Sequence, residues 1–249
     1  MEKITKLLIL LTIGFAAIIL SRLFYFYPNL LLPFWFTIIG YLIYKEMIKH
    51  KQKKGIHPLI LTHIVPWIMI IGIVLLYEGH GINFSANMIS HFLSNANQEL
   101  ISIVYHLDEI LSHILIFAGL FTLFFAGAIL QINRPFSLKM GKSDELALGV
   151  SGVLFGLGLG TALLESNIAV PGLIMSLAFL PGLLLRHWKH KLHIVIRKYP
   201  LNYYIAIILA TTIILLLIYY FAYGGFLPPS EILCGKGYES ACTYYSGIK

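Results

Sequence analysis

The sequence predicts an all-α fold: a polytopic transmembrane bundle of about seven helices, with the N-terminus inside and the C-terminus outside. Composition is the first reason, since 58% of the 249 residues are hydrophobic, 12% are charged and the mean hydropathy is +0.83. A soluble domain usually carries about 25% charged residues. The second reason is a series of apolar runs near the length of about 20 residues that a helix needs to cross a bilayer. The third is the placement of the basic residues.

Seven runs are long enough, or nearly so, to cross a bilayer as helices. They comprise residues 7–27, 29–44, 58–77, 110–133, 146–164, 168–185 and 201–225. The fourth and seventh runs contain no Lys, Arg, Asp or Glu and give the clearest signal. Only Glu165, Ser166 and Asn167 separate the fifth run from the sixth, which predicts a tight helical hairpin.

Basic residues fall almost entirely on one side of the predicted bundle. The segment before the first span and the connections after the second, fourth and sixth spans hold two, five, three and five of the 18 Lys and Arg residues. Only Arg22, Lys236 and Lys249 fall on the other side. Since cytoplasmic segments are the ones enriched in Lys and Arg, the pattern predicts a multi-pass protein of the cell membrane. It also accounts for the net charge of +7, so no nucleic-acid partner is expected.

The domain organisation follows from these spans. Residues 1–225 are expected to form one transmembrane domain, with residues 78–105 as an outer interfacial segment. Residues 226–249 are expected to form a short extracytoplasmic tail. Its two cysteines, Cys234 and Cys242, are the only cysteines of the chain and would form one local disulfide in an oxidising compartment.

A stripe of glycines marks the fifth predicted span. Gly152, Gly156 and Gly160 recur every four residues and therefore lie on one face of a helix. Small residues at this spacing let a neighbouring backbone approach closely. The stripe predicts helix packing within the bundle, and it is also the face through which other membrane subunits would dock. The lipid bilayer is the other expected partner.

The segment His106–His113 carries the densest group of chemically active side chains. On an α-helix each residue turns by about 100°, so His106, Glu109 and His113 share one narrow face. Asp108 then points to the opposite side. Neutral imidazole and carboxylate groups bind transition metals such as zinc, iron, copper or manganese, and this set does not select among the four.

The candidate site combines this face with residues from other segments. Its metal ligands are His106, Glu109, His113 and His91, and its acid or base groups are Glu109, Asp108 and Glu165. Seven residues along one straight helix separate His106 from His113 by about 10 Å, so one helix supplies only part of a metal site. The alternative interpretation is that these side chains are solvated residues at a helix start, where acids favour the positive end of the helix dipole.

Three functions remain open on these observations. The first is a membrane metalloenzyme, a hydrolase or oxidoreductase with an outward-facing site that acts on a lipid-like or small substrate. The second is a transporter or channel-like protein for protons or small cations, because the outer side of the predicted bundle is acidic. The third is a non-catalytic subunit of a larger membrane complex.

Overall fold

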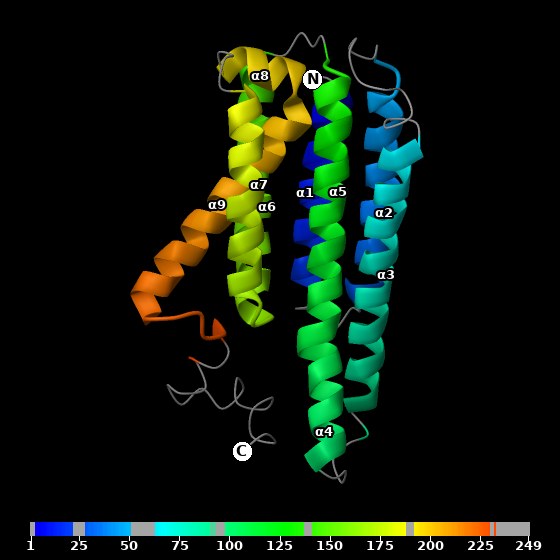
Figure 1. Cartoon of the computed structure of the whole chain (residues 1–249), viewed down its shortest axis with the longest axis vertical. Helices are drawn as coiled ribbons and strands as arrows, with labels where there is room; N and C mark the ends of the chain where they lie inside the picture. The colour runs from blue at the N-terminus through cyan, green and yellow to red at the C-terminus, as the bar shows by residue number, and fades with distance from the viewer. Residues whose placement is uncertain are drawn as a thin grey trace.

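Every regular element in the described part of the chain is helical, as the sequence predicts. The computed structural model describes residues 3–21, 28–50, 63–90, 92, 98–136, 141–187, 192–229 and 232. Seven long helices run along the bundle (Figure 1). They are α1 (Lys3–Ser21), α2 (Pro28–Met47), α3 (Val65–Ser90), α5 (His113–Asn133), α6 (Lys142–Glu165), α7 (Ala169–His187) and α9 (Pro200–Tyr223). Three short elements, α4 (Gln98–Tyr105), the π-helix η3 (His106–Ser112) and α8 (Leu192–Lys198), complete the set.

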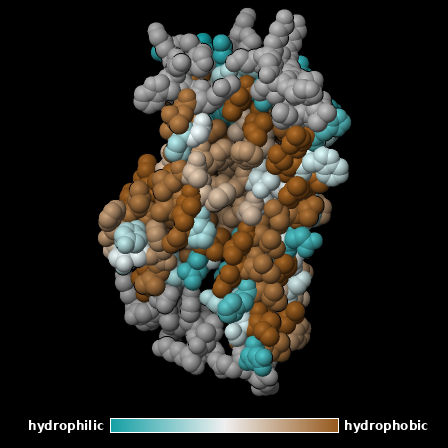
Figure 2. Space-filling view, in the orientation of Figure 1, coloured by the Kyte–Doolittle hydropathy of each residue, from teal (hydrophilic) through white to brown (hydrophobic). Residues whose placement is uncertain are grey.

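Within the described ranges, four helical segments are long and apolar enough to cross a membrane. They are Val65–Ile89, Glu99–Asn133, Lys142–Glu165 and Pro200–Tyr223, and Ala169–Leu185 is a shorter apolar helix. Large apolar side chains on these helices face outward: Trp67 is 64% exposed, Ile174 60% and Phe221 80%. Figure 2 shows that hydrophobic residues dominate the middle of the face in view. Such a surface matches hydrocarbon rather than water as its surroundings.

Contacts between helix termini gather the basic segments at one end of the bundle. Lys3, at the start of α1, pairs with Glu46 near the end of α2 at 3.2 Å. Arg134, just after α5, donates to the carbonyl oxygens of Ile48 and His50 beyond α2, at 2.6 and 3.1 Å. The hydrogen bond from Lys49 to Glu46 is the main reason why the pKa of the Glu46 carboxyl lies below its ordinary value, and partial burial acts in the opposite direction.

Two further contacts hold α8 and the start of α9 at this same end of the bundle. Arg197 of α8 pairs with Glu145 of α6 at 3.2 Å. The first N–H groups of a helix have no partner within it, and Tyr199 supplies no side-chain cap to α9. Pro200 has no N–H to satisfy, and Gln131 of α5 accepts the N–H of Asn202 at 2.7 Å. The N-terminus of α9 is therefore anchored to α5.

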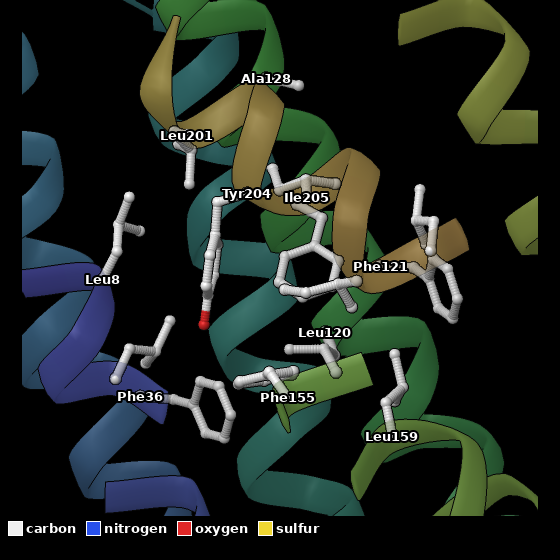
Figure 3. Close-up of a cluster of buried hydrophobic side chains, with 14 of the residues drawn as sticks. Leu8, Phe36, Leu120, Phe121, Ala128, Phe155, Leu159, Leu201, Tyr204 and Ile205 are labelled. Atoms are coloured by element: carbon white, nitrogen blue, oxygen red, sulfur yellow. The ribbon is translucent and has the colours of Figure 1, made fainter. Parts of the chain in front are cut away.

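Aromatic side chains from five helices form the centre of the core. Phe155 of α6 is fully buried and stacks on Phe15 of α1, with ring centroids 4.3 Å apart. Phe36 of α2, Phe124 of α5 and Tyr204 of α9 approach the same ring at centroid distances of 6.1, 6.1 and 6.2 Å. Figure 3 shows Phe36, Phe155 and Tyr204 converging from their helices.

The predicted glycine stripe lies against α9 of the same chain. A Cβ added at Gly156 would lie 2.7 Å from the carbonyl oxygen of Ile208, and one at Gly152 would lie 2.9 Å from Ile207. The hydroxyl of Thr212 donates to the Gly156 carbonyl at 3.1 Å, which fixes the two helices in register. The stripe thus serves close packing inside the chain. Docking of another subunit on this face would require α9 to move away from it.

Two helices extend further than their apolar runs suggest. The third predicted span ends at residue 77, whereas α3 continues to Ser90. The fourth predicted span begins at residue 110, whereas helical structure begins at Gln98 and continues through η3 into α5. Figure 1 shows that α4 lies beyond the turn between α6 and α7, so this helical pair projects past its neighbours. Much of the expected interfacial segment 78–105 therefore belongs to a helical hairpin, and its polar residues lie on long helices.

The packing of α6 on α9 makes a first prediction. Gly156→Val should lower the melting temperature of the purified protein in detergent, because overpacking of this kind costs about 1–3 kcal/mol. The matched control is Gly182→Val on α7, where an added Cβ meets nothing within 4 Å. Equal melting temperatures for the two variants would contradict the proposed contact between α6 and α9.

Candidate functional site: a polar cluster between α3 and η3

Two glycine contacts bring α3 against the long helix that contains η3 and α5. A Cβ at Gly119 of α5 would lie 2.7 Å from the carbonyl oxygen of Gly72 in α3. Further along, a Cβ at Gly79 of α3 would lie 2.6 Å from the carbonyl oxygen of Ser112 in η3. The backbones therefore touch at both levels. Beyond Gly79, several of the buried residues of the two helices are polar.

A buried carboxylate lies at the centre of these polar residues. Asp108 of η3 is 3% exposed, and Asn83 of α3 is 5% exposed. The Asn83 side-chain amide donates to Oδ1 of Asp108 at 2.6 Å, and the amide of Asn87 donates to the same oxygen at 2.9 Å. Asn83 and Asn87 are four residues apart, so one face of α3 presents both amides to the carboxylate.

Hydrogen bonds within each helix orient this cluster. The Asn87 amide also donates to the Asn83 carbonyl oxygen at 2.8 Å, which fixes its direction. The hydroxyl of Ser112, fully buried, donates to the backbone carbonyl of Asp108 and lies 3.5 Å from the Asn83 amide. His80, one turn before Asn83, is 6% exposed. We refer to Asp108, Asn83, Asn87 and Ser112 as the Asp108 cluster.

The helix type decides which residues enter the cluster. Residues His106–Ser112 form a π-helix, whose bonds run from i to i+5 and whose turn is therefore wider than that of an α-helix. Each residue turns by less than the 100° assumed from the sequence. Asp108 and Ser112 are four residues apart and are both buried, whereas the wider turn separates His106 from Glu109 and His113. π-Helical segments are rare and occur frequently at functional sites.

Opposing electrostatic effects act on Asp108. Two amide donors on one oxygen favour the charged carboxylate, and burial away from water favours the neutral acid. A buried carboxylate is tolerated only where such donors are provided. The carboxyl group is the part of the cluster that can bind and release a proton, and its oxygens can also bind a small cation.

The predicted site residues take separate positions around this cluster. His106 is exposed, and its Nδ1 lies 2.8 Å from the carbonyl oxygen of Ser102. Glu109 and His113 are half-buried, and Nδ1 of His113 lies 3.0 Å from the Glu109 carbonyl oxygen. Glu165, at the end of α6, is exposed. His91, Cys234 and Cys242 lie outside the described residues.

The described residues bring no three His, Cys, Asp or Glu side chains close enough to hold one metal ion. The shared face of His106, Glu109 and His113 assumed α-helical rotation, which η3 does not have. The metal site therefore stays a prediction. Of the three predicted acid or base groups, Asp108 is the most deeply buried.

Sequence reasoning missed the amides that contact Asp108. The signal was present in two pairs at four-residue spacing, Asn83 with Asn87 and Asp108 with Ser112. Each pair places two polar side chains on one face of an otherwise apolar helix. The apolar run 58–77 ended before Asn83, which left both asparagines in a presumed connection.

Comparisons with known proteins add no relative. No protein-family model matches the chain, and no significant match was found among curated proteins or solved structures. The case for function therefore depends on the residues themselves.

The contacts of Asp108 make a second prediction. Asn83→Ala should lower the melting temperature, because leaving a buried charged acceptor short of a donor costs about 1–3 kcal/mol. In Asn83→Ala/Asp108→Ala the loss should be smaller than the sum of the two single losses, since the unsatisfied carboxylate is gone. Ser102→Ala, at an exposed side chain of α4, is the control. Strictly additive losses would show that the two side chains are not coupled.

Proposed function

We propose that this chain is an integral membrane protein of seven passes that moves protons or another small cation, and that the Asp108 cluster is its outer binding site. The observation that carries the proposal is a carboxylate 3% exposed between two membrane-length helices, held by two amide donors. A charge buried away from water is costly unless hydrogen bonds compensate it, so a buried carboxylate with its own donors is a candidate group for binding an ion or a proton.

The position of the cluster along the helices supports an entry site. About 20 residues cross the hydrocarbon core, so counting back from Asn133 places the outer edge near His113. Asp108 then lies one to two turns further out, close to the boundary between lipid and water. The basic termini of the helices meet at the opposite end of the bundle. A cation attracted to the acidic outer side would meet Asp108 before it entered the membrane.

The chemistry of the cluster suits a hard cation. The side chains of Asp108, Asn83, Asn87 and Ser112 all carry oxygen atoms, the ligands preferred by small alkali and alkaline-earth ions. The amides donate to Asp108, and rotation of either amide would offer its oxygen to an ion instead. A proton needs only the carboxylate. Binding of a proton and binding of a metal cation therefore both require Asp108.

Flux through reconstituted protein tests the proposal. Proteoliposomes carrying an imposed proton, sodium or potassium gradient should dissipate one of these gradients faster than empty liposomes. Asp108→Asn keeps the size of the side chain and one oxygen that can accept from the two amides, but it removes the charge, and it should abolish that flux. A pH-sensitive dye and ion-sensitive dyes distinguish the cations.

Glu99→Gln provides the control, because Glu99 is an exposed acid on the neighbouring helix α4. Its flux should equal that of the wild type. Equal flux for wild type and Asp108→Asn, or no flux above that of empty liposomes for any of the three cations, would refute the proposal.

Metal binding at Glu109 and His113 is a second candidate, favoured by one observation. A carbonyl oxygen only accepts hydrogen bonds, so the 3.0 Å contact with Glu109 O requires the proton of neutral His113 on Nδ1. This leaves the lone pair on Nε2, the arrangement usual for a metal-bound histidine. Glu109 is half-buried on the same helical segment.

Metal analysis tests this second candidate. Purified wild-type protein incubated with zinc, iron, copper or manganese should retain one of them in stoichiometric amount after dialysis, and His106→Ala/His113→Ala should not. Elemental analysis by mass spectrometry measures the ratio. Metal retained equally by both proteins, or by neither, would contradict a site at these histidines.

A further inference from the structure

A second feature of the bundle is an apolar cavity among its helices, toward the basic end and away from the Asp108 cluster. Its volume is about 70 Å³, and its walls come from α1, α2, α3, α5 and α9. Figure 3 shows part of the wall, where Phe36, Leu120, Tyr204 and Ile205 face one another. Most lining side chains are aliphatic, methionine or aromatic.

The polar groups in the cavity wall already have partners within the chain. The hydroxyl of Thr37 donates to the carbonyl oxygen of Pro33 at 2.8 Å. The hydroxyl of Tyr204 shares a 2.6 Å hydrogen bond with the hydroxyl of Thr12. A polar occupant would lose its hydrogen bonds to water and find few replacements, so the cavity selects an apolar one.

The α2 side of the cavity has one position without a side chain. Gly40 lines the cavity, and a Cβ added to it would meet nothing within 4 Å. Around this glycine, Ile38 is 55% exposed and Tyr41 59%. On α3, which supplies Met69 and Ile73 to the wall, the outward face carries Val74 at 51% exposure. Gly40 itself is partly exposed, and we call the position beside it the mouth of the cavity. The outward residues of α2 and α3 near this position are apolar.

From this geometry we infer that the cavity is a binding site for one hydrocarbon chain of a bilayer lipid, which enters sideways beside Gly40. An empty apolar cavity leaves its wall without dispersion contacts. A lipid chain is the apolar group present at high concentration at this mouth, and it restores those contacts. Met47 and Met69 in the wall adapt readily to a flexible occupant. The site is independent of cation binding at Asp108.

Photo-crosslinking tests the inference directly. The protein is reconstituted with a phospholipid that carries a diazirine on one acyl chain, irradiated, digested and analysed by mass spectrometry. Labels are expected on the wall residues Met47, Met69 and Leu123, as well as on outward residues such as Ile71. In Gly40→Trp the new side chain should fill the mouth and remove most of the label from the wall, while Ile71 keeps its label.

Two further variants keep the outcome decisive. Gly182→Trp, at an equally open glycine of α7, should leave the wall label unchanged. Gly40→Leu, a smaller plug, serves if Gly40→Trp does not yield folded protein, and it should reduce the label in the same direction. An unlabelled wall in the wild type beside a labelled Ile71, or a wall label that both Gly40 variants retain, would overturn the inference.

Discussion

Hydrocarbon forms no hydrogen bonds, so a polar group buried in a membrane bundle depends on partners within the protein. Asp108 takes two amide donors from α3, the N–H of Asn202 finds Gln131, and Thr12 meets Tyr204. In each case the partner comes from another helix. These polar contacts therefore join the bundle at both ends and in its middle, while the outward surfaces remain apolar.

Helices in lipid gain little from the hydrophobic effect between them, so close van der Waals contact must replace it. The chain achieves this contact with glycines at two interfaces. Gly152 and Gly156 admit α9, and Gly72, Gly79 and Gly119 admit the backbones of α3 and its partner to each other. At the second interface, the polar residues follow directly after the glycine contact at Gly79. Close approach at Gly79 and Ser112 brings the short amides of α3 within reach of Asp108.

Much of the fold is readable from the sequence because bilayer length and apolar runs determine it. The runs 110–133 and 201–225 contain the helices α5 and α9 almost residue for residue, and the Glu165–Asn167 break forms the expected turn between α6 and α7. The number of membrane passes remains a prediction. Hydropathy failed at the hairpin, since α3 continues through polar residues whose partners lie on η3, and helical structure begins at Gln98, before the apolar run.

The candidate site was also partly predictable from the sequence. Sequence reasoning selected the segment His106–His113 and included Asp108 among its groups. It placed Asp108 opposite His106, and in the structure Asp108 is buried while His106 is exposed. It could not identify α3 as the helix that Asp108 faces, because Gly79 and Asn83, which contact η3, are distant in sequence. Only the three-dimensional structure brings these elements together.

The central claim is that Asp108 exchanges a cation within a cluster built to hold its carboxyl group. Infrared difference spectroscopy of the reconstituted protein, recorded between the loaded and the unloaded state, observes that group directly. The account predicts a change in a carboxyl or carboxylate band that is present in the wild type and missing in Asp108→Asn. A difference spectrum that is the same in both proteins would contradict it.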